Sequence, residues 1–181
     1  MFRKILGVFL FLNVTVASAN NAELQKLHDE DQASRMAQEQ DHKDDERRIR
    51  VLEILASGGV VTPKDKINAA LVLQHTGFTL CNKDWKSISA ENYLLAHLLV
   101  KSAIKQGAKG AELLYAQTID RYLAMTQGTQ KYGTNVLVDL ETGEQYYPEI
   151  DRSVSDEERA KYGVDKLEVL LARHPERKPK I

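Results

Sequence analysis

The residues of this chain that could do chemistry are polar groups placed where apolar helical segments end. Gln74 and His75 close one such segment, and Asp120 and Arg121 interrupt another. A guanidinium offers a rigid set of donors that fits a carboxylate or a phosphate group, and an imidazole can donate, accept or transfer a proton near neutral pH. With the polar turn after the second segment, these groups make up the candidate ligand-binding residues: Gln74, His75, Asp120, Arg121, Gln130, Tyr132, Gly133 and Thr134.

The acid–guanidinium couple Asp120-Arg121 has two interpretations. It lies among the core-type residues Ile119, Tyr122 and Leu123, and burying a charged group is unfavourable unless the group has a partner. In one interpretation the couple is a structural bracket, with Arg121 paired to a carboxylate and Asp120 holding N–H groups of the following turn. In the other it belongs to a site that uses perturbed charges for binding or catalysis. Physical reasoning alone favours the bracket.

Residue spacing argues against several classes of site. The sequence contains no glycine-rich phosphate loop, no HExxH zinc motif and no GxSxG nucleophile motif. Its five histidines include no pair at i,i+3 or i,i+4 spacing and Cys81 is the single cysteine, so we expect neither a metal centre nor a cofactor. His97 lies in an apolar segment and is predicted to be a hydrogen-bonded core residue. The formal net charge of −1 argues against a nucleic-acid partner.

The first 19 residues have the pattern of a secretory signal peptide. Arg3 and Lys4 precede a short apolar run that ends in Ala17-Ser-Ala19, and these are the three parts of such a peptide. The run is shorter than the roughly 20 apolar residues that a membrane span needs, and a retained N-terminal anchor helix is the alternative. We predict cleavage after Ala19, a periplasmic or secreted protein, and no membrane span in the mature chain.

The elements that would position the candidate residues are predicted to be mainly helical. We expect a small bundle of about four main helices with a short β-hairpin and C-terminal helices, in a single domain at 20–172 followed by a basic tail at 173–181. Apolar residues at three- and four-residue spacing indicate the helices, and glycines or a Thr-Pro pair mark their ends. The first expected element is a helical region at 22–56, continuous or broken near Gln40. Helices are expected at 63–75, 89–106 (capped by Ser89) and 108–126, with a loop of about a dozen residues after Gly77. A hairpin around 141–144, a helix capped by Ser155 and a last helix from Asp165 to Leu171 are expected to follow.

Short polar motifs are spread along nearly the whole chain: Asp31-Gln32-x-x-Arg35, Gln74-His75, Tyr93-Leu-Leu-Ala-His97, Asp120-Arg121, Gln130-Lys-Tyr-Gly-Thr134 and Arg159-Ala-Lys-Tyr-Gly163. In order and spacing they resemble a widespread bacterial family of unknown function, built around DQxxR, QH, DR and QxYGTQ motifs. The family has no established activity, so the resemblance implies a shared architecture and a shared site rather than a named reaction. One departure is Asn135, where the pattern has Gln, because the shorter side chain would reach less far toward a ligand.

These observations support two hypotheses of function. The first is a non-enzymatic exported helical domain that binds a small anionic ligand or an envelope protein through the candidate residues. The second is a small hydrolase or transferase in which His75 is the general base, Asp120 orients it, and Arg121 stabilises developing negative charge. Both hypotheses require the candidate residues to face a common hollow. The contacts of His75, Asp120 and Arg121 discriminate between the two hypotheses.

Overall fold

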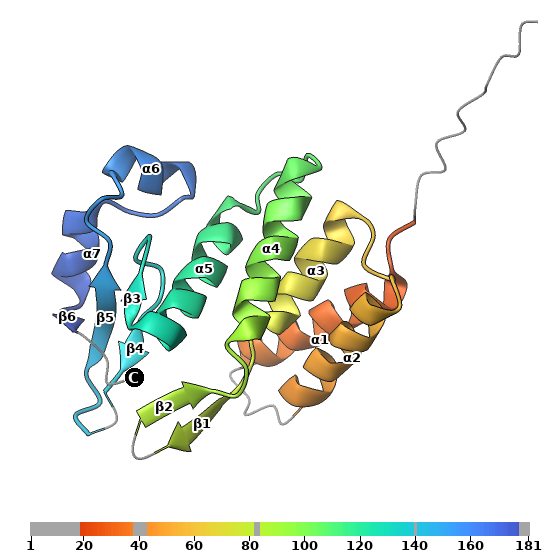
Figure 1. Cartoon of the computed structure of the whole chain (residues 1–181), viewed down its shortest axis with the longest axis horizontal. Helices are drawn as coiled ribbons and strands as arrows, with labels where there is room; N and C mark the ends of the chain where they lie inside the picture. The colour runs from red at the N-terminus through yellow and green to blue at the C-terminus, as the bar shows by residue number, and fades with distance from the viewer. Residues whose placement is uncertain (1–18, 38–42, 82–83, 140, 178–181) are drawn as a thin grey trace, which may run out of the picture.

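The computed structural model describes residues 19–37, 43–81, 84–139 and 141–177 (Figure 1). Over these residues the chain forms seven helices and several short strands, so the mainly α fold expected from the sequence is confirmed. The predicted signal segment, apart from Ala19, lies outside the described residues. So does Gln40, near which the helical region predicted at 22–56 was expected to be either continuous or broken. Within the described ranges no helix is both long enough and apolar enough to cross a membrane.

Five helices form the N-terminal part of the fold: α1 (Ala22–Ala37), α2 (Asp44–Ala56), α3 (Pro63–Leu73), α4 (Glu91–Lys105) and α5 (Glu112–Gln127). Helix α3 packs against α1, α2 and α4, and α4 packs in turn against α5. Figure 1 shows α3 and α4 at the centre of this layer. All five helices contribute to a buried apolar core, which includes Leu24, Val51, Ile54, Leu73, Val100 and Leu114.

Two helices begin where their sequences predict. At α3 the Thr62 hydroxyl accepts a hydrogen bond from the Asp65 amide at 3.1 Å, and the Asp65 carboxylate accepts one from the Thr62 amide at 2.9 Å. This reciprocal pair is a capping box. At α6 (Asp156–Lys161) the Ser155 hydroxyl accepts from the Glu158 amide at 3.2 Å. Both starts are set by groups only three residues apart.

The start of α4 differs from the prediction. Ser89 was expected to cap this helix, but the helix begins at Glu91 and no side chain caps it. The Ser89 hydroxyl donates instead to the Glu91 carboxylate at 3.0 Å. A hydroxyl engaged by a nearby carboxylate is not available to the helix amides, which explains the difference.

A small sheet lies beside α5. β4 (Leu137–Val138) pairs antiparallel with β5 (Gln145–Ile150), which confirms the predicted hairpin, and β3 (Thr129–Gln130) pairs parallel with β5. The interpretation of 173–181 as a tail is wrong at residues 176–177, because β6 (Glu176–Arg177) pairs parallel with β5. The Glu176 carboxylate also accepts a hydrogen bond from the Ile150 amide, 26 residues earlier. Local sequence patterns do not report pairing at such a separation.

The segment after Gly77 also contains strands where a loop was expected. β1 (Phe78–Cys81) pairs antiparallel with β2 (Asp84–Ser87), and Phe78 lies opposite Ser87. Strands of four residues are too short for their alternation to be distinguished from an irregular segment. In Figure 1 this hairpin extends from the side of the five packed helices at which α3 ends and α4 begins.

Helix α5 lies between the first core and a second core, which α6, α7 (Leu167–Arg173) and the sheet complete. Leu114 of α5 lies in the first core and Ala116 lies in the second. At 3.6 residues per turn, Arg121 falls on the face of Leu114 and Asp120 on the face of Ala116. The two members of the couple therefore point toward different cores. The second core consists of Ala116, Tyr132, Tyr147, Ile150, Val154, Val164 and Leu170.

His97 of α4 is a hydrogen-bonded core residue, as predicted. Its side chain is buried, and its Nδ1 lies 3.2 Å from the Tyr115 carbonyl oxygen and 3.4 Å from the Thr118 hydroxyl. Burial lowers the pKa of His97, and the charges of Lys101 and Lys131 act in the same direction. A neutral imidazole in a packed environment is consistent with a structural role.

Candidate functional site

Asp120 holds the turn that follows α5. Its carboxylate accepts hydrogen bonds from the amides of Lys131, Tyr132, Gly133 and Thr134 at 2.7–2.8 Å, and from the Thr134 hydroxyl at 2.9 Å. The side chain has no exposed surface. Burial raises the pKa of the Asp120 carboxyl, while the hydrogen bonds from the turn oppose that shift. The prediction that Asp120 holds N–H groups of the turn is confirmed.

Arg159 of α6 holds the same turn from its carbonyl side. Its guanidinium is fully buried and donates to the carbonyl oxygens of Lys131 and Tyr132 through Nη1, and of Asp151 and Val154 through Nη2. Asp120 and Arg159 thus lie on opposite sides of one stretch of backbone, each satisfying a different set of polar groups. The guanidinium of the predicted bracket is Arg159 and not Arg121.

Gln130 closes the turn on itself. Its amide oxygen accepts from the Asn135 amide at 2.9 Å, and its Nε2 donates to the carbonyl oxygens of Asn135 and Pro148, both at 3.1 Å. The Gln130 side chain binds only main-chain atoms of Asn135. Asn135 stands where the motif pattern has Gln, and this substitution does not affect the contact. The Asn135 side chain is buried, and its Nδ2 has no hydrogen-bond partner in the described part of the chain. We call residues 130–135 the bracketed loop.

Tyr132 anchors the bracketed loop in the second core. Its ring lies 4.7 Å from that of Tyr162, and the Tyr162 ring stacks on Tyr115 at 5.1 Å between centroids. Tyr132 is 1% exposed, and burial raises the pKa of its hydroxyl well above the usual range. This side chain is committed to packing. Five of the eight candidate residues therefore make internal contacts of one loop: Asp120, Gln130, Tyr132, Gly133 and Thr134.

Gly133 is the position of the bracketed loop that tolerates no side chain. Its φ is +97°, and a Cβ there would lie 2.6 Å from Leu170 Cδ1. We expect Gly133→Ala to reduce the free energy of unfolding by about 3 kcal/mol, from backbone strain and overpacking together. Gly143→Ala is the control, since Gly143 has φ +73° and nothing within 4 Å of a Cβ; about 1 kcal/mol is expected. Equal losses in urea unfolding would contradict the close packing.

The remaining candidate residues lie elsewhere: Gln74 and His75 follow the end of α3, and Arg121 lies on α5. His75 Nδ1 lies 3.0 Å from Asp31 Oδ1 and 2.8 Å from Asp31 Oδ2. The Asp31 side chain is 1% exposed and the His75 side chain is 19% exposed. Burial acts to raise the pKa of Asp31, but the hydrogen bonds from His75 and Gln32 and the charge of Arg35 hold it below its ordinary value. His75 is thus oriented by an ionised carboxylate and still reaches the surface.

Two guanidinium groups lie beside this pair. Arg35 Nη2 is 3.6 Å from Asp31 Oδ1, the oxygen that also faces His75, and Arg35 forms a second ion pair with Asp44 of α2. Arg121 Nη1 donates to the Gln74 carbonyl oxygen at 2.6 Å. We call Asp31, Arg35, Gln74, His75 and Arg121 the basic cluster.

Arg121 differs from its expected role. It was predicted to pair with a carboxylate, but among the described residues it forms no ion pair, and its one hydrogen bond is to a carbonyl. The residue is partly buried and keeps some contact with solvent. Burial lowers the pKa of Arg121, and the charge of Arg35 lowers it further, but a guanidinium remains charged at physiological pH.

The predicted site is therefore divided in two. Gln74, His75 and Arg121 belong to the basic cluster, and the other five residues belong to the bracketed loop. The second hypothesis named Asp120 as the residue that orients His75; the structure places Asp31 in that position, while the oxygens of Asp120 are occupied by the loop. Asp31 and Arg35 were not among the candidates. Their i,i+4 spacing in the DQxxR motif was the available signal.

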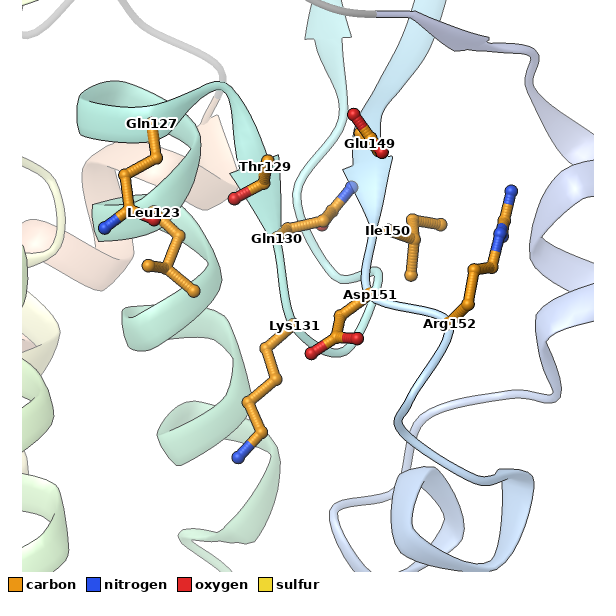
Figure 2. Close-up of a pocket in the computed structure, with 9 residues that line it drawn as sticks. All are labelled: Leu123, Gln127, Thr129, Gln130, Lys131, Glu149, Ile150, Asp151 and Arg152. Atoms are coloured by element: carbon orange, nitrogen blue, oxygen red, sulfur yellow. The ribbon is translucent and has the colours of Figure 1, made fainter.

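A pocket of about 360 Å³ opens between the end of α5 and strands β3 and β5 (Figure 2). It contains one candidate residue, Gln130, whose amide is engaged inside the bracketed loop. Two cations and two carboxylates line it, so it has no excess charge to attract an ion. The pocket therefore does not bring the predicted site residues together. Its lining residues are Leu123, Gln127, Thr129, Gln130, Lys131, Glu149, Ile150, Asp151 and Arg152.

No family model, curated protein or solved structure matches this chain. The resemblance drawn from the short motifs therefore stays a prediction, and the functional argument rests on the geometry of the basic cluster. No group of three or more histidine, cysteine or carboxylate side chains that could hold a metal ion occurs in the part of the chain that the structure describes. The chemistry available at the cluster is that of guanidinium donors, an imidazole and a carboxylate.

Proposed function

We propose that this chain is an exported helical domain that binds a small anionic ligand at the basic cluster. One observation carries the proposal: Arg121 is partly exposed, has no carboxylate partner among the described residues, and binds the carbonyl of Gln74, the residue before a histidine that Asp31 holds in place. A guanidinium in a partly buried position interacts strongly with a carboxylate or phosphate group, because solvent screening is reduced there.

Arg121 is the guanidinium of the cluster that has no carboxylate partner among the described residues. Asp31 is almost completely buried, so its charge is directed at His75 and Arg35 rather than at solvent. The Arg35 side chain is 39% exposed, and Arg121 is partly exposed. An anion can therefore approach Arg121 without facing Asp31, whereas Arg35 keeps its ion pair with Asp44. Export is the companion proposal and depends on residues 1–19.

Replacing Arg121 tests this proposal. We expect that phosphate, sulfate or citrate, added at constant ionic strength, raises the melting temperature, since a ligand at 100 times its Kd stabilises the native state by about 2.7 kcal/mol. Arg121→Lys should abolish most of that shift while leaving the melting temperature of the free protein within a few degrees, because lysine keeps the charge but loses the planar donor set.

Arg173→Lys is the matched control. Arg173 is exposed and pairs with exposed Asp165, so this variant should respond to the anions as the unmodified protein does. The proposal fails if none of the three anions shifts the melting temperature. It also fails if Arg121→Lys responds like the control variant, or if it unfolds without any ligand effect, as a purely structural arginine would.

A second candidate function is hydrolysis, and the Asp31–His75 contact favours it. A carboxylate bound to Nδ1 leaves Nε2 free to accept a proton from water, whose oxygen attacks an acyl or phosphoryl centre while the leaving group takes the proton back from the imidazolium. Arg121 would stabilise the negative charge that develops. We expect turnover of p-nitrophenyl acetate or p-nitrophenyl phosphate that His75→Gln abolishes; undetectable turnover with both esters, or equal rates in His75→Gln, would exclude general-base catalysis on these substrate classes.

A further inference from the structure

The contact between Asp31 and His75 determines which ring nitrogen carries the proton. Both Asp31 oxygens face Nδ1, at 3.0 and 2.8 Å, and an ionised carboxylate can only accept hydrogen bonds. Nδ1 must therefore donate. In the neutral imidazole the other nitrogen, Nε2, is then an acceptor with a free lone pair.

Nε2 of His75 is an acceptor that lies near guanidinium donors, so a ligand must offer both negative charge and a hydrogen-bond donor. Asp31 contacts His75 directly. Arg35 contacts the same carboxylate and is also paired with Asp44 of α2. Arg121 of α5 donates to the carbonyl of Gln74, the residue before His75, and Tyr93 of α4 donates its hydroxyl to the Thr76 carbonyl. The guanidinium groups require negative charge. The Nε2 lone pair repels an oxygen that carries no proton and accepts a hydrogen bond from one that does.

We infer that the basic cluster selects an anion that retains an O–H group, of which hydrogen phosphate is the simplest, over an equally charged anion that has none. This inference rests on the proposed function, because it names the ligand class of the same site. Phosphate fits a guanidinium and a neighbouring acceptor, since it presents several negative oxygens and one O–H on a single tetrahedral atom. Sulfate has the same shape and charge but no proton, and a site built around a hydrogen-bonding partner discriminates strongly against an analogue that lacks it.

The test compares three anions by calorimetric titration at about pH 8, where an ordinary histidine is neutral. Inorganic phosphate is then mainly HPO4²⁻, whereas sulfate and the methyl phosphate dianion have no O–H. We expect phosphate to bind at least about tenfold more tightly than either of the others. Equal affinities for phosphate and sulfate would overturn the inference and leave the anion site intact, and tighter binding of methyl phosphate would overturn it in favour of an ester ligand. Absence of binding by all three would overturn the inference, and the proposed function would fall with it if citrate also leaves the melting temperature unchanged.

Asp31→Asn separates the positioning role of Asp31 from simple charge attraction. The asparagine amide can donate to Nδ1, which moves the ring proton to Nε2 and turns the acceptor into a donor. We expect the preference for phosphate over sulfate to fall to about one or to reverse, whereas loss of a nearby negative charge alone would strengthen both anions equally. Strengthening of both by the same factor would contradict the inference.

Asp29→Asn is the matched control, because Asp29 also contacts a histidine on α1, with His28 Nδ1 at 2.9 Å, but is exposed. It should leave the preference unchanged. Nitrogen-15 spectra of the histidine side chains provide a readout that needs neither ligand nor variant: at about pH 8, His75 should show a protonated Nδ1 and an unprotonated Nε2. The opposite tautomer would overturn the inference even if Asp31→Asn does not fold.

Discussion

Asp120→Asn is expected to lower the free energy of unfolding by about 3 kcal/mol. The five hydrogen bonds to this carboxylate come from four amides and one hydroxyl of a single loop. An asparagine oxygen replaces only part of this acceptor capacity, and its NH₂ group faces donors that then have no partner. Leaving buried donors unsatisfied is more unfavourable than losing a solvent-exposed bond, at about 1–3 kcal/mol for each group. Urea unfolding followed by circular dichroism measures the difference.

Asp151→Asn is the control for this substitution. Asp151 is exposed, and its carboxylate accepts hydrogen bonds from the amide and hydroxyl of Ser153 at 2.8 and 2.7 Å. A surface contact of this kind contributes at most about 1 kcal/mol. If the two variants lost similar stability, the buried carboxylate would not be the main support of the loop.

Arg159→Met is expected to have an effect of similar or larger size, about 4 kcal/mol. The methionine fills part of the volume but leaves four carbonyl oxygens without donors, those of Lys131, Tyr132, Asp151 and Val154. Arg159→Lys should recover only a minority of the lost unfolding free energy. A single ammonium group cannot reach all of the carbonyls that the two Nη groups of the planar guanidinium contact. Arg152→Met, which removes a half-exposed arginine paired with Glu176, should cost less than about 1 kcal/mol.

The double variant tests whether Asp120 and Arg159 act on one structural unit. Both side chains hold the main chain of Lys131 and Tyr132, one through the amides and the other through the carbonyls. Once one substitution has released the loop, the other has less left to disrupt, so the combined loss should be smaller than the sum of the two. Strict additivity would mean that the two charges support separate parts of the fold.

The local elements were the most accurately predicted part of this protein. The start of α3 at Thr62, the start of α6 at Ser155 and the hairpin formed by β4 and β5 agree with the structure. Each depends on groups that lie within a few residues of one another, so the sequence displays both partners together. The pairing of β6 with β5 was missed because the two strands are distant in sequence and each contributes only a few residues.

The candidate site was predicted in its residue types but not in its grouping. Asp120 and Arg121 are neighbours in sequence and were treated as one couple, yet successive residues of a helix point about 100° apart. Asp120 consequently meets the bracketed loop, and Arg121 meets the Gln74 carbonyl on the other side of α5. The partner of His75 came from α1, 44 residues earlier.

The sequence by itself determined that the chain is mainly helical, where several helices begin, and which polar residues are unusual enough to need partners. The tertiary structure alone decided who those partners are: Arg159 rather than Arg121 opposite Asp120, and Asp31 rather than Asp120 beside His75. The physical reason is that a cap or a turn is satisfied by groups a few residues away, whereas a buried charge is satisfied by whatever group the packing of helices and loops brings to it.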